Sequence, residues 1–148
     1  MRSPGNTMKI ILYLAASFFF LGSSIQGEDG YVGRLERFAG TPYSVLNCSG
    51  FICAAHRHER CSAKEMWNAC GNSLTVIEQI TGKDNINYSK LRGGDVAAFH
   101  GVHVAAYLGD GIWMDSDPSH GGVAKFKMGN VNSRDPWFAG DIKILRWR

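Results

Sequence analysis

The feature that most constrains this fold is a change in the hydrophobic pattern near Lys90. Before it, apolar residues recur at helical spacing, and after it, short apolar runs alternate with glycine-containing turns. Helices that precede a run of neighbouring strands indicate an α+β fold, with N-terminal helices packed on an antiparallel sheet. We expect about five strands, because the runs at 95–99, 102–108, 111–115, 123–128 and 142–147 are each bounded by turn residues.

Three helices are expected before these strands. Asp29 can cap the first, which should end at Gly40, and the second begins at Cys48. The third has a capping box of Ser62 and Glu65. Apolar residues at helical spacing over 74–80 then predict helix until Gly82.

The N-terminus has the pattern of a secretory signal peptide. Arg2 and Lys9 precede an uncharged apolar run at 10–22, and small residues follow up to Gly27. The run is short for a bilayer span, although a membrane anchor is the alternative. We therefore expect a signal peptide at 1–27 and a single domain at 28–148. The mature protein is expected to be a secreted, extracellular monomer that does not bind a membrane after the signal peptide is cleaved.

Length and charge exclude several function classes. The chain has 148 residues, which is enough for one domain, and it is 45% apolar, which is ordinary for a globular protein. Arg2 and Lys9 lie in the segment that we expect to be removed, so the remaining chain is nearly neutral. No run of Lys and Arg is present, and nucleic acid is therefore not an expected partner.

Cys48 is the candidate nucleophile. It opens a predicted helix after a turn-rich segment, where the positive end of the helix dipole favours the thiolate. Ser49 and Gly50 are small enough for a substrate to approach the sulfur. The free N–H groups of the first turn, with Tyr43 nearby, can stabilise an oxyanion.

A thiolate needs a base and the base needs an orienting group, and His103 and Asp115 on successive predicted strands can supply them. A three-residue connection at 108–110 places His103 opposite Asp115. A two-residue Asp110-Gly111 turn places His103 opposite Pro118 instead. Residue spacing alone does not choose between these registers.

Four ordered segments of the chain resemble the NlpC-type cysteine peptidases, which are papain-like enzymes that cut peptide stems of bacterial cell walls. The segments are GTPY at 40–43, NCSGF at 47–51, LRGGDVAAF at 91–99 and HVAAYLGDGIWMD at 103–115. The resemblance implies a papain-like NlpC-type fold with Cys48, His103 and Asp115 as catalytic residues. It also favours the register that brings Asp115 to His103.

Within this group, the chain looks most like the type VI secretion amidase effectors and their secreted eukaryotic counterparts, the domesticated amidase effectors of ticks and mites. The resemblance implies a bacteriolytic peptidoglycan amidase of innate immunity, which hydrolyses a stem or cross-link amide, with the bond between D-alanine and the neighbouring diamino acid as one target. Bacterial peptidoglycan is the expected partner, and no cofactor or metal is expected.

The sequence departs from the family pattern before the nucleophile. Asn47 stands where the family usually has Asp, and the aromatic-and-glycine stretch after Tyr43 is reduced to 44–46. The substrate groove is therefore expected to be lined differently, with Tyr43, Ser49 and Asp117 as the substrate-binding residues.

Other residues offer alternatives for these roles. Asp117 can replace Asp115 as the orienting group, and His100 can replace His103 as the base. His120 either lines the site or is an exposed loop residue.

The remaining cysteines predict one disulfide. If Cys48 is the catalytic thiol, Cys53 is expected to pair with Cys61 or Cys70, because a two-turn helix would hold the last two about 13 Å apart. A short or broken helix would allow Cys61 and Cys70 to pair. The segment from Cys53 to Cys61, with His56 and His58, also has zinc-ligand types, although its spacing is unusual.

A rival function is a catalytically inactive secreted protein that binds cell walls or is stabilised by disulfides. A non-catalytic protein with two disulfides would have Cys48 in a bridge, whereas an enzyme needs it free.

Overall fold

The structure is a computed structural model that describes residues 30–148. The predicted signal peptide and the expected cap Asp29 lie outside these residues. The helices are α1 (Tyr31–Arg37), α2 (Cys48–His56), α3 (Ala63–Trp67) and α4 (Pro136–Ala139). The strands are β1 (Leu74–Thr81), β2 (Val96–Phe99), β3 (His103–Gly109), β4 (Ile112–Asp117), β5 (Gly122–Lys127) and β6 (Asp141–Trp147).

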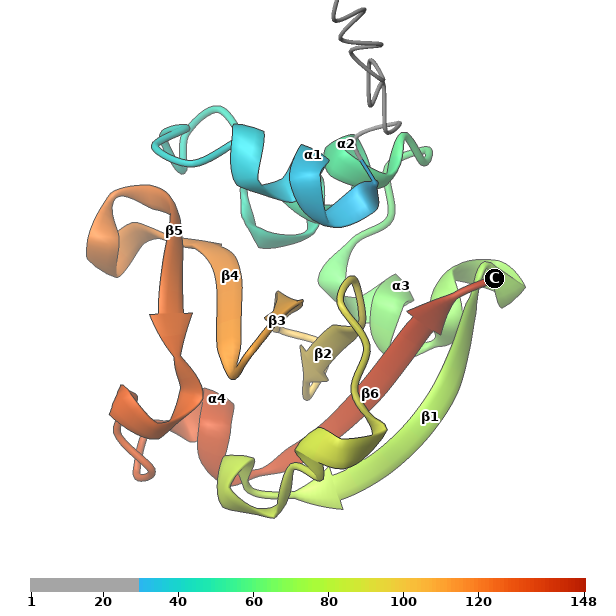
Figure 1. The fold of residues 1–148 in the computed structure, drawn as a ribbon, viewed down its shortest axis with the longest axis vertical. Coiled ribbons are helices and arrows are strands. Elements are labelled where there is room, and N and C mark those ends of the chain that lie inside the picture. The colour runs from blue at the N-terminus through green and yellow to red at the C-terminus, as the bar shows by residue number, and fades with distance from the viewer. Residues whose placement is uncertain (1–29) are drawn as a thin grey trace, which may run out of the picture.

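The strands form one six-stranded antiparallel sheet in the order β1-β6-β2-β3-β4-β5. The sheet curves around the centre of the molecule, with α1, α2 and α3 on one side and α4 near its far end (Figure 1). The α+β class, the antiparallel sheet and the N-terminal helices are therefore confirmed. No helix within residues 30–148 has the length and apolar character that crossing a membrane requires.

The sheet is buried on both faces, because alternate residues of each central strand enter different cores. Val96 and Ala98 of β2 join the core beneath the N-terminal helices, with Phe51 of α2. Ala97 and Phe99 join the second core, on the side of α4. This double burial explains why β2 is apolar throughout instead of alternating.

The helix predicted over 74–80 is wrong, because this segment is β1. Several of its residues are β-branched, which favours a strand, and β1 pairs with β6 along its whole length. A bulge between Val76 and Glu78 interrupts the strand alternation. Leu74 then packs in one core while Ile77 and Ile80 pack against the other, and their spacing in the sequence imitates a helix.

The helix starts follow the sequence more closely. The capping box of Ser62 and Glu65 is present at α3. Helix α2 begins at Cys48 as predicted. The N-cap of α1 is Gly30, which makes no side-chain capping bond.

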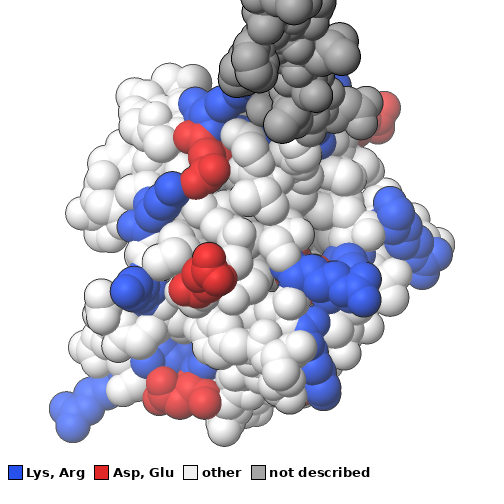
Figure 2. Space-filling model, viewed as in Figure 1, with Lys and Arg blue, Asp and Glu red and all other residues white. Residues whose placement is uncertain are grey.

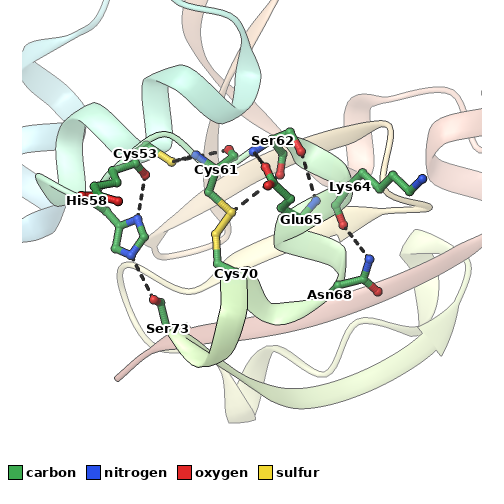
Figure 3. Close-up of a disulfide and its surroundings, with 10 residues drawn as sticks. Cys53, His58, Cys61, Ser62, Lys64, Glu65, Asn68, Cys70 and Ser73 are labelled. Carbon is green, nitrogen blue, oxygen red and sulfur yellow. Dashed lines mark hydrogen bonds between the residues drawn. A yellow bond between two sulfur atoms is a disulfide. The ribbon is translucent and has the colours of Figure 1, made fainter.

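The disulfide joins Cys61 to Cys70, so the expected pairing of Cys53 is wrong. Helix α3 ends at Trp67, and Ala69 and Cys70 adopt positive φ angles, which turn the chain back. The two Cα atoms are therefore 6.2 Å apart, within reach of a bridge. Cys53 is a free, buried thiol that accepts a hydrogen bond from the Cys61 N–H at 3.3 Å (Figure 3).

Peptide mapping of the unreduced protein tests this pairing. We expect a Cys61–Cys70 cross-linked peptide, with Cys48 and Cys53 alkylated only as free thiols. Reduction should lower the free energy of unfolding by about 3 kcal/mol, because the bridge closes a short loop in the unfolded chain. A bridge that contains Cys53 or Cys48 would contradict the structure.

Gly122 fixes the segment that leads to Cys48. Its φ is +147°, and a Cβ there would lie 2.1 Å from the Thr41 carbonyl oxygen and 2.8 Å from the Tyr43 nitrogen. This close approach lets the Val123 N–H donate to the Thr41 carbonyl and the Tyr43 N–H donate to the Gly121 carbonyl. The 40–46 segment is thereby tied to the start of β5.

Replacing Gly122 with alanine tests this anchoring. We expect Gly122→Ala to lower the free energy of unfolding by about 3 kcal/mol, from steric displacement of the 41–43 backbone added to backbone strain. Gly121→Ala is the matched control, because Gly121 has a φ of +84° but open space around it. It should cost only about 1 kcal/mol in chemical denaturation, and equal losses would show that the close contact is unimportant.

Candidate active site

Cys48 lies in the first turn of α2, where the local sequence builds a tight helix start. Asn47 is the N-cap, and its side-chain oxygen accepts a hydrogen bond from the Gly50 N–H at 2.8 Å. A Cβ on Gly50 would lie 2.9 Å from that oxygen, so glycine keeps the cap short. Asn47 thus performs the capping role that an Asp could fill, while the N–H groups of the first turn face away from the helix ladder.

Packing and one side-chain hydrogen bond hold the start of α2 against the sheet. Helix α2 packs on β3 and β4. The buried Ser116 of β4 donates its hydroxyl to the carbonyl of Leu46 at 2.5 Å. Because Leu46 lies just before the N-cap, this hydrogen bond places Cys48 at the end of the sheet where β3 begins and β4 ends.

His103 and Asp115 are brought together inside the protein. The His103 Nε2 and the Asp115 Oδ2 are 2.7 Å apart, and each residue is 2% exposed. His103 also lies close enough to Cys48 for the thiol to raise the pKa of the imidazole. Since Nε2 faces the carboxylate, Nδ1 is the ring nitrogen left for the thiol.

The strand register that creates this contact matches neither of the two considered from sequence. Asp110 and Gly111 form a two-residue turn with positive φ at both positions, and Gly109 pairs with Ile112. A bulge between Tyr107 and Gly109 then shifts the register by one residue. Continuing this register would place Asp117 opposite His103, so Asp115 reaches the imidazole as a diagonal neighbour on the same face.

The neighbours of His103 favour its protonated form. Burial acts to lower its pKa, but the hydrogen bonds with Asp115 and Cys48 and the negative charge of these groups outweigh burial and raise the pKa of His103 to about 9. At neutral pH the imidazole is therefore a cation held between the Asp115 carboxylate and the Cys48 sulfur. This arrangement favours an imidazolium that can later protonate a leaving amine.

Aromatic rings close the site around the imidazole. Trp137 of α4 stacks on His103 with ring centroids 4.3 Å apart, and Phe99 lies on it at 5.9 Å. These rings exclude water from the bond between His103 and Asp115, which strengthens it. Trp137 is far from His103 in the chain, and no local signal in the sequence identified it as a site residue.

The residues weighed as alternatives lie in distinct places. Asp117 shares the site: ligand atoms of His103, Asp115 and Asp117 all lie within 4.8 Å of one another. Its Oδ1 accepts a hydrogen bond from the Ser119 N–H, while Asp115 contacts the imidazole. His120 also approaches, with its Nε2 3.0 Å from the Asp115 Oδ1. His100 is exposed at the turn before β3, and its ring covers Gly140.

Two of the residues predicted to bind substrate, Tyr43 and Ser49, differ in their exposure to solvent. Tyr43 is 38% exposed on the segment before α2, where a substrate can touch it. Ser49 is buried, and its hydroxyl lies 3.5 Å from the Asn47 Oδ1. This position of the Ser49 hydroxyl fits a role in supporting Asn47, the N-cap of α2.

Two groups of described residues contain side chains of the types that bind metal ions. The segment from Cys53 to Cys61 does not offer four ligands, because Cys61 is bonded to Cys70 and His58 Nε2 is 3.0 Å from the Ser73 hydroxyl. The His103, Asp115 and Asp117 group is compact, but the nearest nitrogen and oxygen of the first two are already hydrogen bonded to each other.

The titration of His103 tests the electrostatic account. The raised pKa means that this residue contributes stability below its ordinary value of 6.5 and that the contribution is lost as pH rises through about 9. In NMR titrations we expect the His103 ring to stay protonated above pH 7, and Asp115→Asn to lower its pKa. Asp110→Asn, at the exposed hairpin turn, should leave the titration unchanged, and a wild-type pKa near the ordinary value would refute the account.

Comparison with models of known protein families finds no match for this chain. Comparison with curated proteins likewise finds no match. The geometry of Cys48, His103 and Asp115 and the four ordered sequence segments are therefore the grounds on which a function is proposed.

Proposed function

We propose that this protein is a secreted cysteine peptidoglycan amidase that hydrolyses stem-peptide or cross-link amide bonds. The single observation that carries the proposal is the buried His103 imidazole, which is bound to the Asp115 carboxylate at 2.7 Å and lies close enough to Cys48 for the two to interact. A nucleophile at a helix start, a base beside it and a carboxylate that orients the base form the arrangement required for acyl transfer.

The thiol state supports an enzyme over a purely structural protein. Cys48 is free, whereas a defence protein stabilised by two disulfides would need it in a bridge. The bridge between Cys61 and Cys70 also fits a protein made for an oxidising, extracellular compartment. This agrees with the signal peptide that the N-terminal sequence predicts.

The substrate class rests on the resemblance to NlpC-type peptidases and amidase effectors. The four segments that carry it place the candidate nucleophile, base and orienting residue in the order of that family. In the structure these segments supply the stretch before α2, the start of α2, the buried strand β2, and the hairpin of β3 and β4. The papain-like fold and the D-alanine to diamino-acid cross-link remain part of the proposal.

The mechanism begins with a thiolate and an imidazolium formed when the Cys48 proton moves to His103. The thiolate attacks the amide carbonyl carbon, and the Cys48 backbone N–H stabilises the oxyanion. His103 then donates its proton to the leaving amine as the C–N bond breaks. Water, deprotonated by His103, cleaves the thioester and restores the thiol.

Asp115 keeps the imidazole oriented through this cycle. Its bond to Nε2 leaves Nδ1 directed at the reacting atoms, and its charge stabilises the imidazolium. Trp137 keeps the pair away from water. Both residues act through His103 and are positioning residues.

Replacement of the nucleophile tests the proposal. We expect Cys48→Ala to abolish release of soluble fragments from purified peptidoglycan while its thermal unfolding stays close to that of the wild type. Cys53→Ala is the matched control, because Cys53 is the other free, buried cysteine on the same helix. It should retain activity as long as it stays folded. A Cys48→Ala protein that still digests peptidoglycan would end the proposal.

A further inference from the structure

A cavity separate from the candidate active site lies at the other end of β2. It has a volume of about 270 Å³ and is lined by the segment before β2, the end of β6, the last residue of α2 and the first residue of α1. Phe99, at the end of β2, pairs with His103, whereas Asp95, just before β2, lines the cavity. Four residues of extended chain separate these places by about 13 Å. The proposed mechanism therefore leaves this cavity unused.

One side of the cavity is a turn in the sequence segment LRGGD at 91–95, to which the proposed mechanism gives no role. The Asp95 N–H donates to the Arg92 carbonyl at 3.0 Å and closes the turn, and Gly94 has a φ of +95°. A Cβ on Gly94 would lie 2.7 Å from the Tyr31 ring. Glycine thus lets the ring of Tyr31 lie directly on the turn, and Arg92 and Tyr31 line the same cavity.

The charged side chains of the lining leave an excess of positive charge. Three arginines and one aspartate line the cavity, and Arg146 binds both oxygens of Asp95, at 2.7 and 2.8 Å. The exposed Arg148 donates only its Nε, to the Thr75 hydroxyl, and the exposed Arg92 guanidinium has no hydrogen bond or ion pair with the residues that the structure describes. Figure 2 shows that Lys and Arg predominate on the side of the molecule where β6 ends.

Aromatic residues form the rest of the wall. The His56 ring stacks on the Trp147 indole with centroids 4.0 Å apart. The Tyr31 hydroxyl lies near the indole N–H, but within residues 30–148 neither atom, nor the His56 Nδ1, has a partner in hydrogen-bonding geometry. The fourth buried side-chain atom of this kind in that range is the Asp115 Oδ1 of the candidate active site. Such atoms are rare and are expected at functional sites, so their concentration here indicates a binding site.

We propose that this cavity binds a phosphate monoester, at a site separate from the catalytic one. The forked guanidinium groups of Arg92 and Arg148 would donate hydrogen bonds to the phosphate oxygens. Their two uncompensated charges match a phosphate monoester, which carries about −1.5 to −2 at pH 7, better than a carboxylate, which carries one charge. The unpartnered ring atoms are enclosed, so the charged contacts come from the exposed guanidinium groups.

The cavity also has room for the group that carries the phosphate. Its volume is several times the share of one water molecule in the liquid, about 30 Å³. The accessible parts of Tyr31 and Trp147 would pack on a sugar-sized group. A phosphorylated sugar is therefore expected to bind more tightly than the free phosphate ion. This inference goes beyond the proposed function and does not depend on it.

Three probes test the ligand class. The wild type is titrated at constant ionic strength with glucose 6-phosphate, glucose and inorganic phosphate, and NMR follows the amides of Gly93 and Gly94 and the indole of Trp147. We expect glucose 6-phosphate to shift these resonances, inorganic phosphate to bind more weakly, and glucose to have no effect. No shift with glucose 6-phosphate, or an equal shift with glucose, would overturn the site. Equal affinity for the two phosphates would assign it to the free ion and overturn the monoester.

Variants that remove charge locate the binding. Arg92→Gln with Arg148→Gln should weaken glucose 6-phosphate binding about a hundredfold, because each lost charge-assisted hydrogen bond corresponds to about tenfold. Arg60→Gln with Arg134→Gln is the matched control, since it removes two charges from exposed arginines outside this cavity. It should change the affinity by less than about twofold. Equal weakening in the two double variants would show a general attraction of anions to the protein and would overturn the proposal.

The same titration of Cys48→Ala separates this proposal from the proposed function. Glucose 6-phosphate should bind this variant as tightly as the wild type, because the cavity lies away from the thiol. Loss of binding in Cys48→Ala would place the ligand at the candidate active site and overturn the cavity assignment. A wild-type protein that binds glucose 6-phosphate here but never digests peptidoglycan would contradict only the proposed function.

Discussion

The candidate site depends on the imidazole of His103, which is held between the Asp115 carboxylate and the Cys48 thiol. A buried histidine would normally lose its proton, because burial disfavours the charged ring. Here two hydrogen bonds and the negative charge of its partners reverse that effect. The fold must therefore bring three segments to one point and keep water away from them.

The surrounding structure meets this demand through backbone anchors. Gly122 lets the segment before α2 lie directly on β5, and Ser116 fixes Leu46 against β4. On the face shown in Figure 2, Lys and Arg lie among Asp and Glu over the left and centre, whereas the charged side chains on the right are mostly Lys and Arg.

The sequence predicted the parts of this arrangement that local patterns encode. The start of α2 at Cys48 and the capping box of α3 follow from residue types at short spacing. The strands after Lys90 follow from apolar runs between turns. The helix predicted over 74–80 was wrong. A β-bulge interrupts the strand-like alternation of its side chains, and pairing with β6 determines its structure. The predicted pairing of Cys53 was wrong because α3 is short and the chain reverses before Cys70, which brings Cys70 next to Cys61.

The site itself was predictable only in part. Cys48, His103 and Asp115 were identified, but the register that joins the last two depends on a bulge after Tyr107 that no local residue pattern specifies. Trp137 contacts His103 only through tertiary packing and could not be found from spacing.

Alkylation of the native protein by iodoacetamide, followed by mass analysis, tests the central claim most directly. The account predicts one adduct, on Cys48 and not on Cys53, and a much slower reaction in His103→Ala. An equally rapid reaction in His103→Ala, or an unreactive Cys48 in the folded wild type, would show that the imidazole does not activate the thiol.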